Sequence, residues 1–142
     1  MITPRGRRVA VDVGSVRVGV AVCDPDGILA TPVETIRRAK DGSDIARLAE
    51  IITEYEAIGV VIGLPRTLRG EEGSASRAAR YFGRQLAAEL DDLSIEFYDE
   101  RLTTVTATQA LRASGVKAIH ARAVVDQAAA VAILQGWLDA QR

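Results

Sequence analysis

The sequence contains few of the residues that form disulfides or zinc sites. Among its 142 residues there is one cysteine, Cys23, and one histidine, His120. One cysteine cannot form a disulfide within the chain, which is typical of a protein kept in the reducing cytoplasm. Because sulfur and imidazole ligands are nearly absent, a zinc site is disfavoured.

Long apolar runs are also missing. No run approaches the ~20 apolar residues that span a bilayer, and the first residues lack the apolar core of a signal peptide. The sequence therefore predicts a soluble, cytoplasmic protein with no membrane partner.

Neither sign of charge dominates, since 18 Lys and Arg residues oppose 19 Asp and Glu residues. The charges are nevertheless segregated along the chain. Residues 66–84 contain five arginines and two glutamates, whereas residues 85–100 contain six acids and no base. The net charge gives no indication of a polyanionic partner, whereas the concentration of arginines in residues 66–84 does.

Hydrophobic periodicity predicts a single α/β domain over residues 1–142. Strands are expected at 8–13, 16–24, 28–36, 60–63 and 94–98, and helices from 43 to Gly59, at 74–90, from about 103, and at 122–140. The first three strands, joined by tight turns, form an antiparallel meander, and the later alternation requires parallel crossovers. Ser43 is expected to cap its helix, and residues 115–121 to interrupt the pattern before the last one.

Asp12 is the first candidate for a functional residue. It lies among small and branched apolar residues typical of a buried strand, where an ionised carboxylate needs a cation or a hydrogen-bonding partner. Asp99 and Glu100 directly follow the fifth expected strand, and Asp126 falls in the first turns of the last expected helix. Because sites in open sheets form beyond the carboxyl ends of strands, three carboxylates from distant segments are expected to meet there. Such a cluster needs compensation, and its oxygen ligands indicate Mg²⁺ or Mn²⁺.

Four motifs resemble, in order and spacing, those of the YqgF/RuvX family of ribonuclease H-like nucleases. They are DVGSVRVGVAV (12–22), VIGLPRTLRGEEGSAS (61–76), YDERLTT (98–104) and VDQAAAVAILQGWLD (125–139). The resemblance implies a ribonuclease H-like fold with a five-stranded mixed sheet of order 3-2-1-4-5, flanked by helices. It also implies a nuclease, because the family is described as Holliday junction resolvases and as nucleases that mature the 5′ end of small-subunit ribosomal RNA.

The resemblance places an acidic triad on Asp12, Glu100 and Asp126. Two Mg²⁺ or Mn²⁺ ions ~4 Å apart would activate a water and stabilise the leaving oxygen, with Asp12 bridging both ions. The strand position that holds an acid in related resolvases is Gly63 here, so the second ligand must come from the fifth strand. Asp99 remains an alternative to Glu100, since strand alternation sends the two side chains to opposite faces.

Arginines follow the second motif. Arg77, Arg80 and Arg84 have the spacing i, i+3, i+7 and are expected to form a stripe on one side of the 74–90 helix. Arg66 and Arg69 precede them in a loop, where Arg69 replaces the acid usual in the family. Together these residues predict a track for a phosphate backbone, which would recognise shape rather than base sequence. 

For Arg101, contact with the scissile phosphate and pairing with Asp99 are both open. Thr103 is interpreted as a helix cap. His120 is interpreted as a solvated residue rather than a proton shuttle, and Cys23 as buried rather than bridging two chains. The apolar ridge near the C-terminus is expected to pack in the core, with a homodimer contact as the alternative; its members are Ile133, Leu134, Trp137 and Leu138.

Three classes of function remain. The first is a metal-dependent endonuclease acting on branched DNA or on precursor 16S rRNA. The second is a phosphotransferase, because Asp-x-Gly followed by a hairpin also resembles the phosphate loop of actin-like kinases, although this chain is too short to enclose a nucleotide between two domains. The third is a non-catalytic nucleic-acid-binding module of the same fold, against which the complete acidic triad argues.

Overall fold

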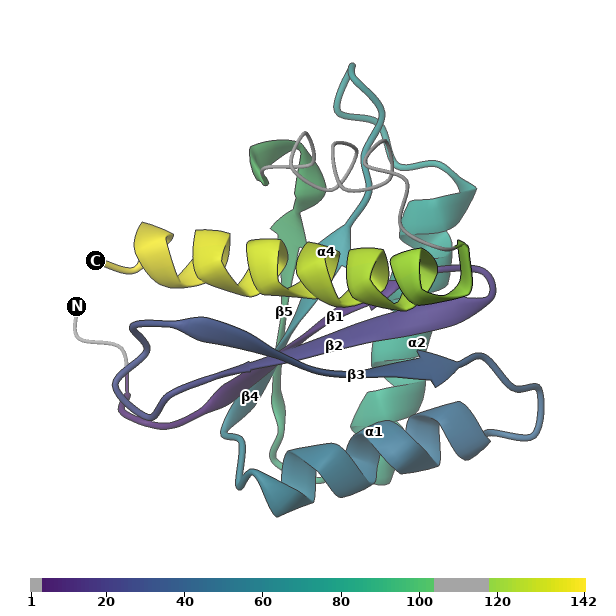
Figure 1. Cartoon of the computed structure of the whole chain (residues 1–142). Coiled ribbons are helices and arrows are strands. Elements are labelled where there is room, and N and C mark those ends of the chain that lie inside the picture. Colours follow the sequence, from purple (N-terminus) through teal and green to yellow (C-terminus); the bar gives the residue numbers. More distant parts are fainter. Residues whose placement is uncertain (1–3, 104–117) are drawn as a thin grey trace.

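The computed structural model describes residues 4–103 and 118–142, without the side chains of residues 118–124. Its centre is a five-stranded sheet of order β3-β2-β1-β4-β5 (Figure 1). The strands are β1 (Arg8–Val13), β2 (Arg17–Cys23), β3 (Ala30–Arg37), β4 (Gly59–Leu64) and β5 (Ser94–Asp99). β1, β2 and β3 pair antiparallel, whereas β4 pairs parallel with both β1 and β5. The predicted mixed sheet and strand order are confirmed.

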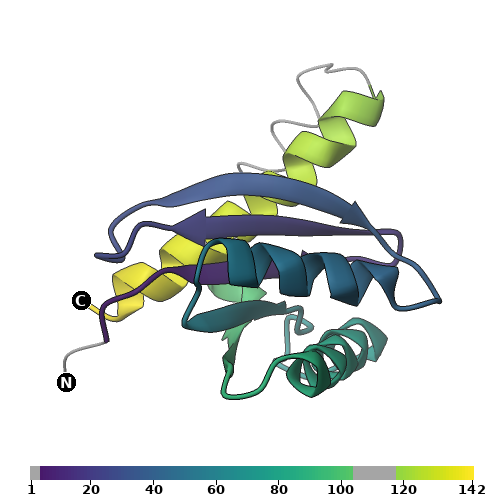
Figure 2. The same cartoon turned by 90° about the horizontal axis from the view of Figure 1, so that it is seen from below.

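Helices cover both faces of this sheet. α1 (Ser43–Glu54) and α2 (Ser74–Glu89) contact each other on one face, and α4 (Ala118–Ala140) crosses β1, β2 and β3 on the other (Figures 1 and 2). A 3₁₀ turn, η1 (Glu100–Leu102), directly follows β5. In the described part of the chain, no helix is long and apolar enough to cross a membrane.

The two faces of the sheet carry side chains of different size. The face under α1 and α2 is filled by branched and aromatic residues such as Val11, Leu48 and Phe82. On the α4 face, the buried core residues that β1 and β2 contribute are small: Ala10, Ala21 and Cys23. Because neighbouring residues of a strand point to opposite faces, Asp12 lies on the α4 face, two residues after Ala10.

Two local predictions are wrong. α4 begins at Ala118 rather than at residue 122, so Asp126 lies in its third turn and His120 lies on helical backbone rather than in a break. Gly42, at φ +85°, occupies the cap position of α1, so Ser43 is the first residue of the helix rather than its cap. Thr103 follows η1, and its hydroxyl donates to the Glu100 carbonyl 2.7 Å away, while its role as a cap of the next helix stays a prediction. The helix expected after Thr103 falls outside the described residues.

Two predictions about burial are confirmed. Cys23 is buried at the end of β2, where burial raises the pKa of its thiol. The ridge of Ile133, Leu134, Trp137 and Leu138 packs in the core on the α4 face.

Candidate active site

The side chains of Asp12 and Glu100 meet above the α4 face of the sheet. They come from β1 and from the turn after β5, which are separated by β4. Gly63 of β4 makes the meeting possible, because a Cβ there would lie 2.7 Å from the Glu100 carboxylate oxygen. The Glu100 side chain therefore occupies the space that a side chain at position 63 would fill. The resemblance implies an acid at this position in related resolvases.

The contact between the two carboxyl groups changes their protonation. Burial, followed by the hydrogen bond and the charge of Asp12, raises the pKa of Glu100 to about 8. Glu100 is thus largely protonated at neutral pH and shares its proton with Asp12. A pair of acids held this way is poised to exchange that proton for a cation.

The carboxylate of Asp99 binds Arg101. It accepts a hydrogen bond from the Arg101 backbone N–H at 2.9 Å and pairs with the Arg101 guanidinium at 2.6 Å. These bonds lower the pKa of Asp99. The structure therefore brings Glu100, and not Asp99, against Asp12, and it pairs Arg101 with Asp99.

Asp126 is brought to the same region through its backbone. Gly19 is the register partner of Asp12 across β1 and β2, and a Cβ on Gly19 would collide with the main-chain carbonyl of Asp126. α4 thus rests directly on the glycine that neighbours Asp12. The Asp126 carboxylate, however, pairs with Arg17, whose Nε lies 2.9 Å from Oδ2. The two side chains are 19% and 32% exposed.

The carboxylates suit a hard divalent cation in part. Asp12 and Glu100 supply adjoining oxygen ligands, and burial together with the charge of Asp12 disfavours the ionised form of Glu100, which a bound cation would stabilise. Within residues 4–103 and 118–142, no group of three His, Cys, Asp or Glu side chains is close enough to hold an ion. Two of the three carboxyl groups that were expected to meet, those of Asp12 and Glu100, are in contact. The third, that of Asp126, pairs with Arg17 instead.

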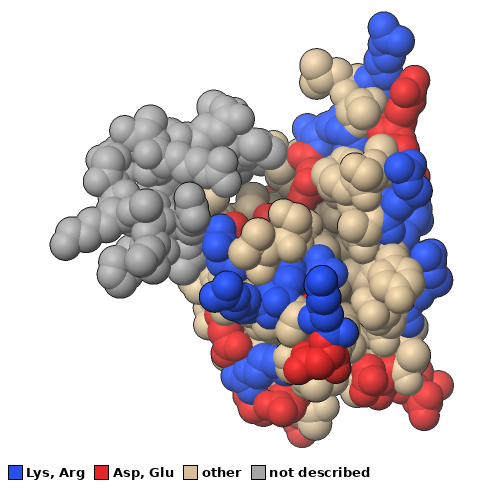
Figure 3. Space-filling view, turned by 90° about the vertical axis from the view of Figure 1, so that its right-hand side faces the viewer, with Lys and Arg blue, Asp and Glu red and all other residues tan. Residues whose placement is uncertain are grey.

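The predicted arginine track is divided between internal ion pairs and exposed side chains. Arg80 is bound to Glu72 at 2.6 Å and lies 4.9 Å above the Phe97 ring, and Arg66 lies 3.8 Å from Glu72. For Arg69, Arg77 and Arg84, no ion pair is formed among the described residues. Figure 3 shows this end of the molecule, where Lys and Arg side chains are spread over the surface with acidic side chains between them.

Sequence reasoning missed Arg17 and Tyr81. Arg17 gains its importance from α4, which the sequence does not place over β2. Tyr81 carries a signal in the sequence, because it lies four residues after Arg77 and three before Arg84 and so shares their helical face. It is 55% exposed, although aromatic side chains usually bury most of their surface.

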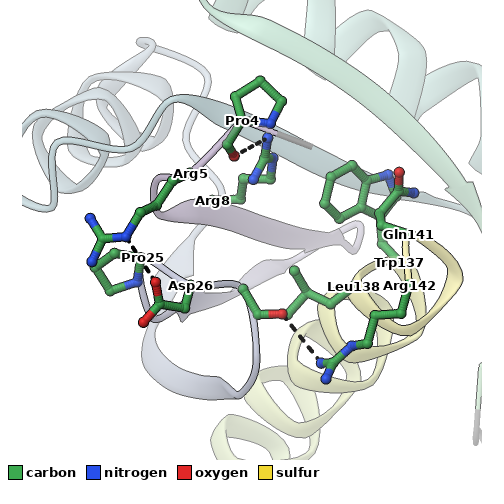
Figure 4. A pocket seen from close by; sticks show the side chains of 10 residues that line it. Pro4, Arg5, Arg8, Pro25, Asp26, Trp137, Leu138, Gln141 and Arg142 are labelled. Atoms are coloured by element: carbon green, nitrogen blue, oxygen red, sulfur yellow. Dashed lines mark hydrogen bonds and ion pairs between the residues drawn. The ribbon is translucent and has the colours of Figure 1, made fainter. Parts of the chain in front are cut away.

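A cavity of about 430 Å³ lies at the opposite end of β1, between the N-terminal segment, the β2–β3 turn and the end of α4 (Figure 4). Its cations are occupied: Arg5 pairs with Asp26 at 2.8 Å, and Arg8 lies 4.9 Å above the Trp137 ring. No pair of carboxyl groups lines it. The candidate chemistry is therefore at the other end of the strand.

Solved structures define the class of this fold. The RuvC of Thermus thermophilus in complex with a Holliday junction substrate matches with a TM-score of 0.63 at 16% identity, covering 96% of this chain and 95% of that one. A second structure of Thermus thermophilus RuvC gives a TM-score of 0.57, also at 16% identity, over 95% of each chain. The chain therefore has the ribonuclease H-like fold of a resolvase.

The sequence identifies the family within this class. The family model described as "RuvX: Holliday junction resolvase" matches residues 6–140, and the chain belongs to this family. A relative from Nocardia farcinica is 63% identical over 95% of this chain and 78% of its own length. One from Streptomyces coelicolor is 55% identical over 97% of this chain and 83% of its own length. Both carry the name "Putative pre-16S rRNA nuclease".

Proposed function

We propose that this protein is a metal-dependent endonuclease that hydrolyses phosphodiester bonds of structured nucleic acid. The observation that carries the proposal is the contact between Asp12 and Glu100 on the α4 face, next to the point where α4 crosses Gly19. Two carboxyl groups in contact and partly withdrawn from water repel each other when both are ionised, and a hard cation between them would stabilise the ionised pair. The RuvX family match and the names of the relatives support the same activity.

Asp12, Glu100 and Asp126 would hold Mg²⁺ or Mn²⁺, two ions in all. When bound, such ions polarise the phosphate and lower the pKa of a water that attacks it. To hold such an ion, Glu100 would have to be deprotonated, and the Asp126 carboxylate would have to exchange its ion pair with Arg17 for the ion. Arg17 is then free to face a phosphate of the substrate.

Exposed arginines would position the substrate. Arg69, Arg77 and Arg84 offer cations for the phosphate backbone, while Arg66, Arg80 and Arg101 would have to leave Glu72 or Asp99 to do so. Phosphate contacts fix position and carry no base sequence. The substrate is therefore expected to be recognised by its shape.

Precursor 16S rRNA is the first candidate substrate, because relatives at 55–63% identity carry that name. A four-way DNA junction is the second, because the family description names it. A non-catalytic module would not need the Asp12–Glu100 pair. An actin-like phosphotransferase would need a second domain to enclose its nucleotide.

The test is cleavage of both substrates by the purified protein in Mg²⁺ or Mn²⁺, compared with Asp12→Asn. Asp26→Asn is the matched control, because Asp26 is an exposed acid at the other end of β2. Cleavage that is lost in Asp12→Asn and kept in Asp26→Asn supports the proposal. Equal cleavage by both variants, or none by the wild type with either substrate, contradicts it.

A further inference from the structure

A polar groove of about 610 Å³ lies beside α2. Four segments form it: the β1–β2 turn with Ser15, the β3–α1 loop with Arg38 and Lys40, the start of α1 with Asp44, and α2 with Tyr81 and Gln85. Ser15 follows Asp12 by three residues. The groove therefore opens next to the turn that leads away from the acidic pair.

The contacts of Arg38 hold the segments that form this groove together. Its Nη1 donates to the Gly14 carbonyl at 2.9 Å, and its Nε donates to Asp44 at 3.1 Å. The guanidinium also lies 5.4 Å above the ring of Phe82, which is fully buried. One side chain thus ties the β1–β2 turn, the start of α1 and the core side of α2 together, and it neutralises the buried Asp44.

Tyr81 gives the groove an aromatic wall. It stands between Arg77 and Arg84 on one face of α2, and the Arg84 guanidinium lies 5.7 Å from its ring centroid. More than half of the Tyr81 side chain nevertheless remains exposed. An exposed ring flanked by cations is the arrangement that stacks an unpaired base while the cations meet its phosphates.

Two cations, Arg38 and Lys40, and two acids, Asp41 and Asp44, line the groove. Lys40 is exposed and, in the part of the chain that the structure describes, forms no ion pair. The acid beside it, Asp41, accepts a hydrogen bond at 3.0 Å from the backbone N–H of Ser43 and so faces the start of α1. Lys40 and Arg84 therefore remain as the cations available to a ligand.

We propose that this groove binds an unpaired nucleotide of the substrate, with the base stacked on Tyr81 and the phosphates on Lys40 and Arg84. The inference rests on the proposed function in that the ligand belongs to the nucleic acid that the acids would cleave. A duplex keeps its bases stacked inside and cannot offer one to Tyr81. The groove would thus select substrates that contain a single-stranded stretch.

The test is equilibrium binding of a fluorescent 12-nucleotide single-stranded RNA and of a blunt duplex of the same length, measured by anisotropy without divalent metal. All variants are made in the Asp12→Asn background. Tyr81→Ala should weaken single-strand binding at least about fivefold, the lower end of the loss of one base–aromatic stack, while Tyr81→Phe keeps it. Lys40→Ala should lower the salt dependence by about one phosphate contact. Ile28→Ala, an exposed apolar truncation at the other end of the sheet, is the matched control.

Several outcomes would overturn the groove. They are no loss in Tyr81→Ala, a loss in Tyr81→Phe as large as in Tyr81→Ala, and an equal loss for the duplex and the single strand. None of these outcomes depends on cleavage. A protein that binds as described and cleaves neither substrate would contradict the proposed nuclease activity and support the nucleotide-binding groove. A protein that cleaves but binds independently of Tyr81 would support the nuclease activity and contradict the groove.

Discussion

The two faces of the sheet differ in the size of the side chains that lie between the strands and the covering helices. Under α1 and α2, large side chains such as Leu48 and Phe82 hold the helices at a distance and fill the space between. Under α4, Gly19 and Gly63 remove side chains where main chain or carboxylates must approach the sheet. The first face supplies hydrophobic stability, and the second gives up part of that stability to gather charged groups.

Phe82→Ala tests the first face and should have the largest effect on stability. Phe82 is fully buried against the sheet, and truncating such a residue removes about 3–5 kcal/mol from the free energy of unfolding. Urea denaturation followed by circular dichroism measures the loss. At denaturant concentrations below the unfolding transition, the variant should bind Mg²⁺ as the wild type does, because Phe82 lies on the face opposite Asp12. A loss of Mg²⁺ binding in the folded variant would contradict the separation of stability and metal binding between the two faces.

Gly19→Ala tests the second face. The new methyl group would collide with the main chain of Asp126, so α4 must move away from β2, at a cost of about 3 kcal/mol. Unlike Phe82→Ala, this variant should also lose Mg²⁺ binding in calorimetry, because the displaced helix carries Asp126. Gly73→Ala is the control, since a Cβ at Gly73 meets nothing within 4 Å. Mg²⁺ affinity unchanged in a folded Gly19→Ala would show that the close approach of α4 is not needed.

The large-residue face was the easier one to predict from sequence. Alternation in the strands and the helical spacing of Ile45, Leu48 and Ile52 define a core directly. On the other face, the motifs point to Asp12 and Glu100, but the choice of Glu100 over Asp99 needed the position of η1. The ion pair of Arg17 with Asp126 joins residues 109 positions apart and depends on how α4 lies, which no local pattern specifies.

Glu100→Gln should alter the pH dependence of stability in metal-free protein. Because the pKa of Glu100 rises from 4.5 to about 8 on folding, its stabilising contribution is complete below pH 4.5 and is lost as the pH rises through 8. With partial exposure allowed for, we expect the wild type to lose about 2 kcal/mol relative to Glu100→Gln between pH 5 and pH 9. Thermal unfolding across this range measures the difference, and Mg²⁺ should reduce it. Parallel pH curves for the two proteins would contradict the shared proton.

Arg17→Gln should have the smallest effect on stability and the most specific effect on the site. The ion pair with Asp126 is partly exposed, so its loss should cost about 1 kcal/mol or less. Because Arg17 competes with a cation for the Asp126 carboxylate, its removal should tighten Mg²⁺ binding severalfold in calorimetry. Arg5→Gln, which breaks an ion pair with Asp26 at the other end of the molecule, should leave Mg²⁺ affinity unchanged. Weaker Mg²⁺ binding in Arg17→Gln would mean that Arg17 holds Asp126 in place for the metal rather than away from it.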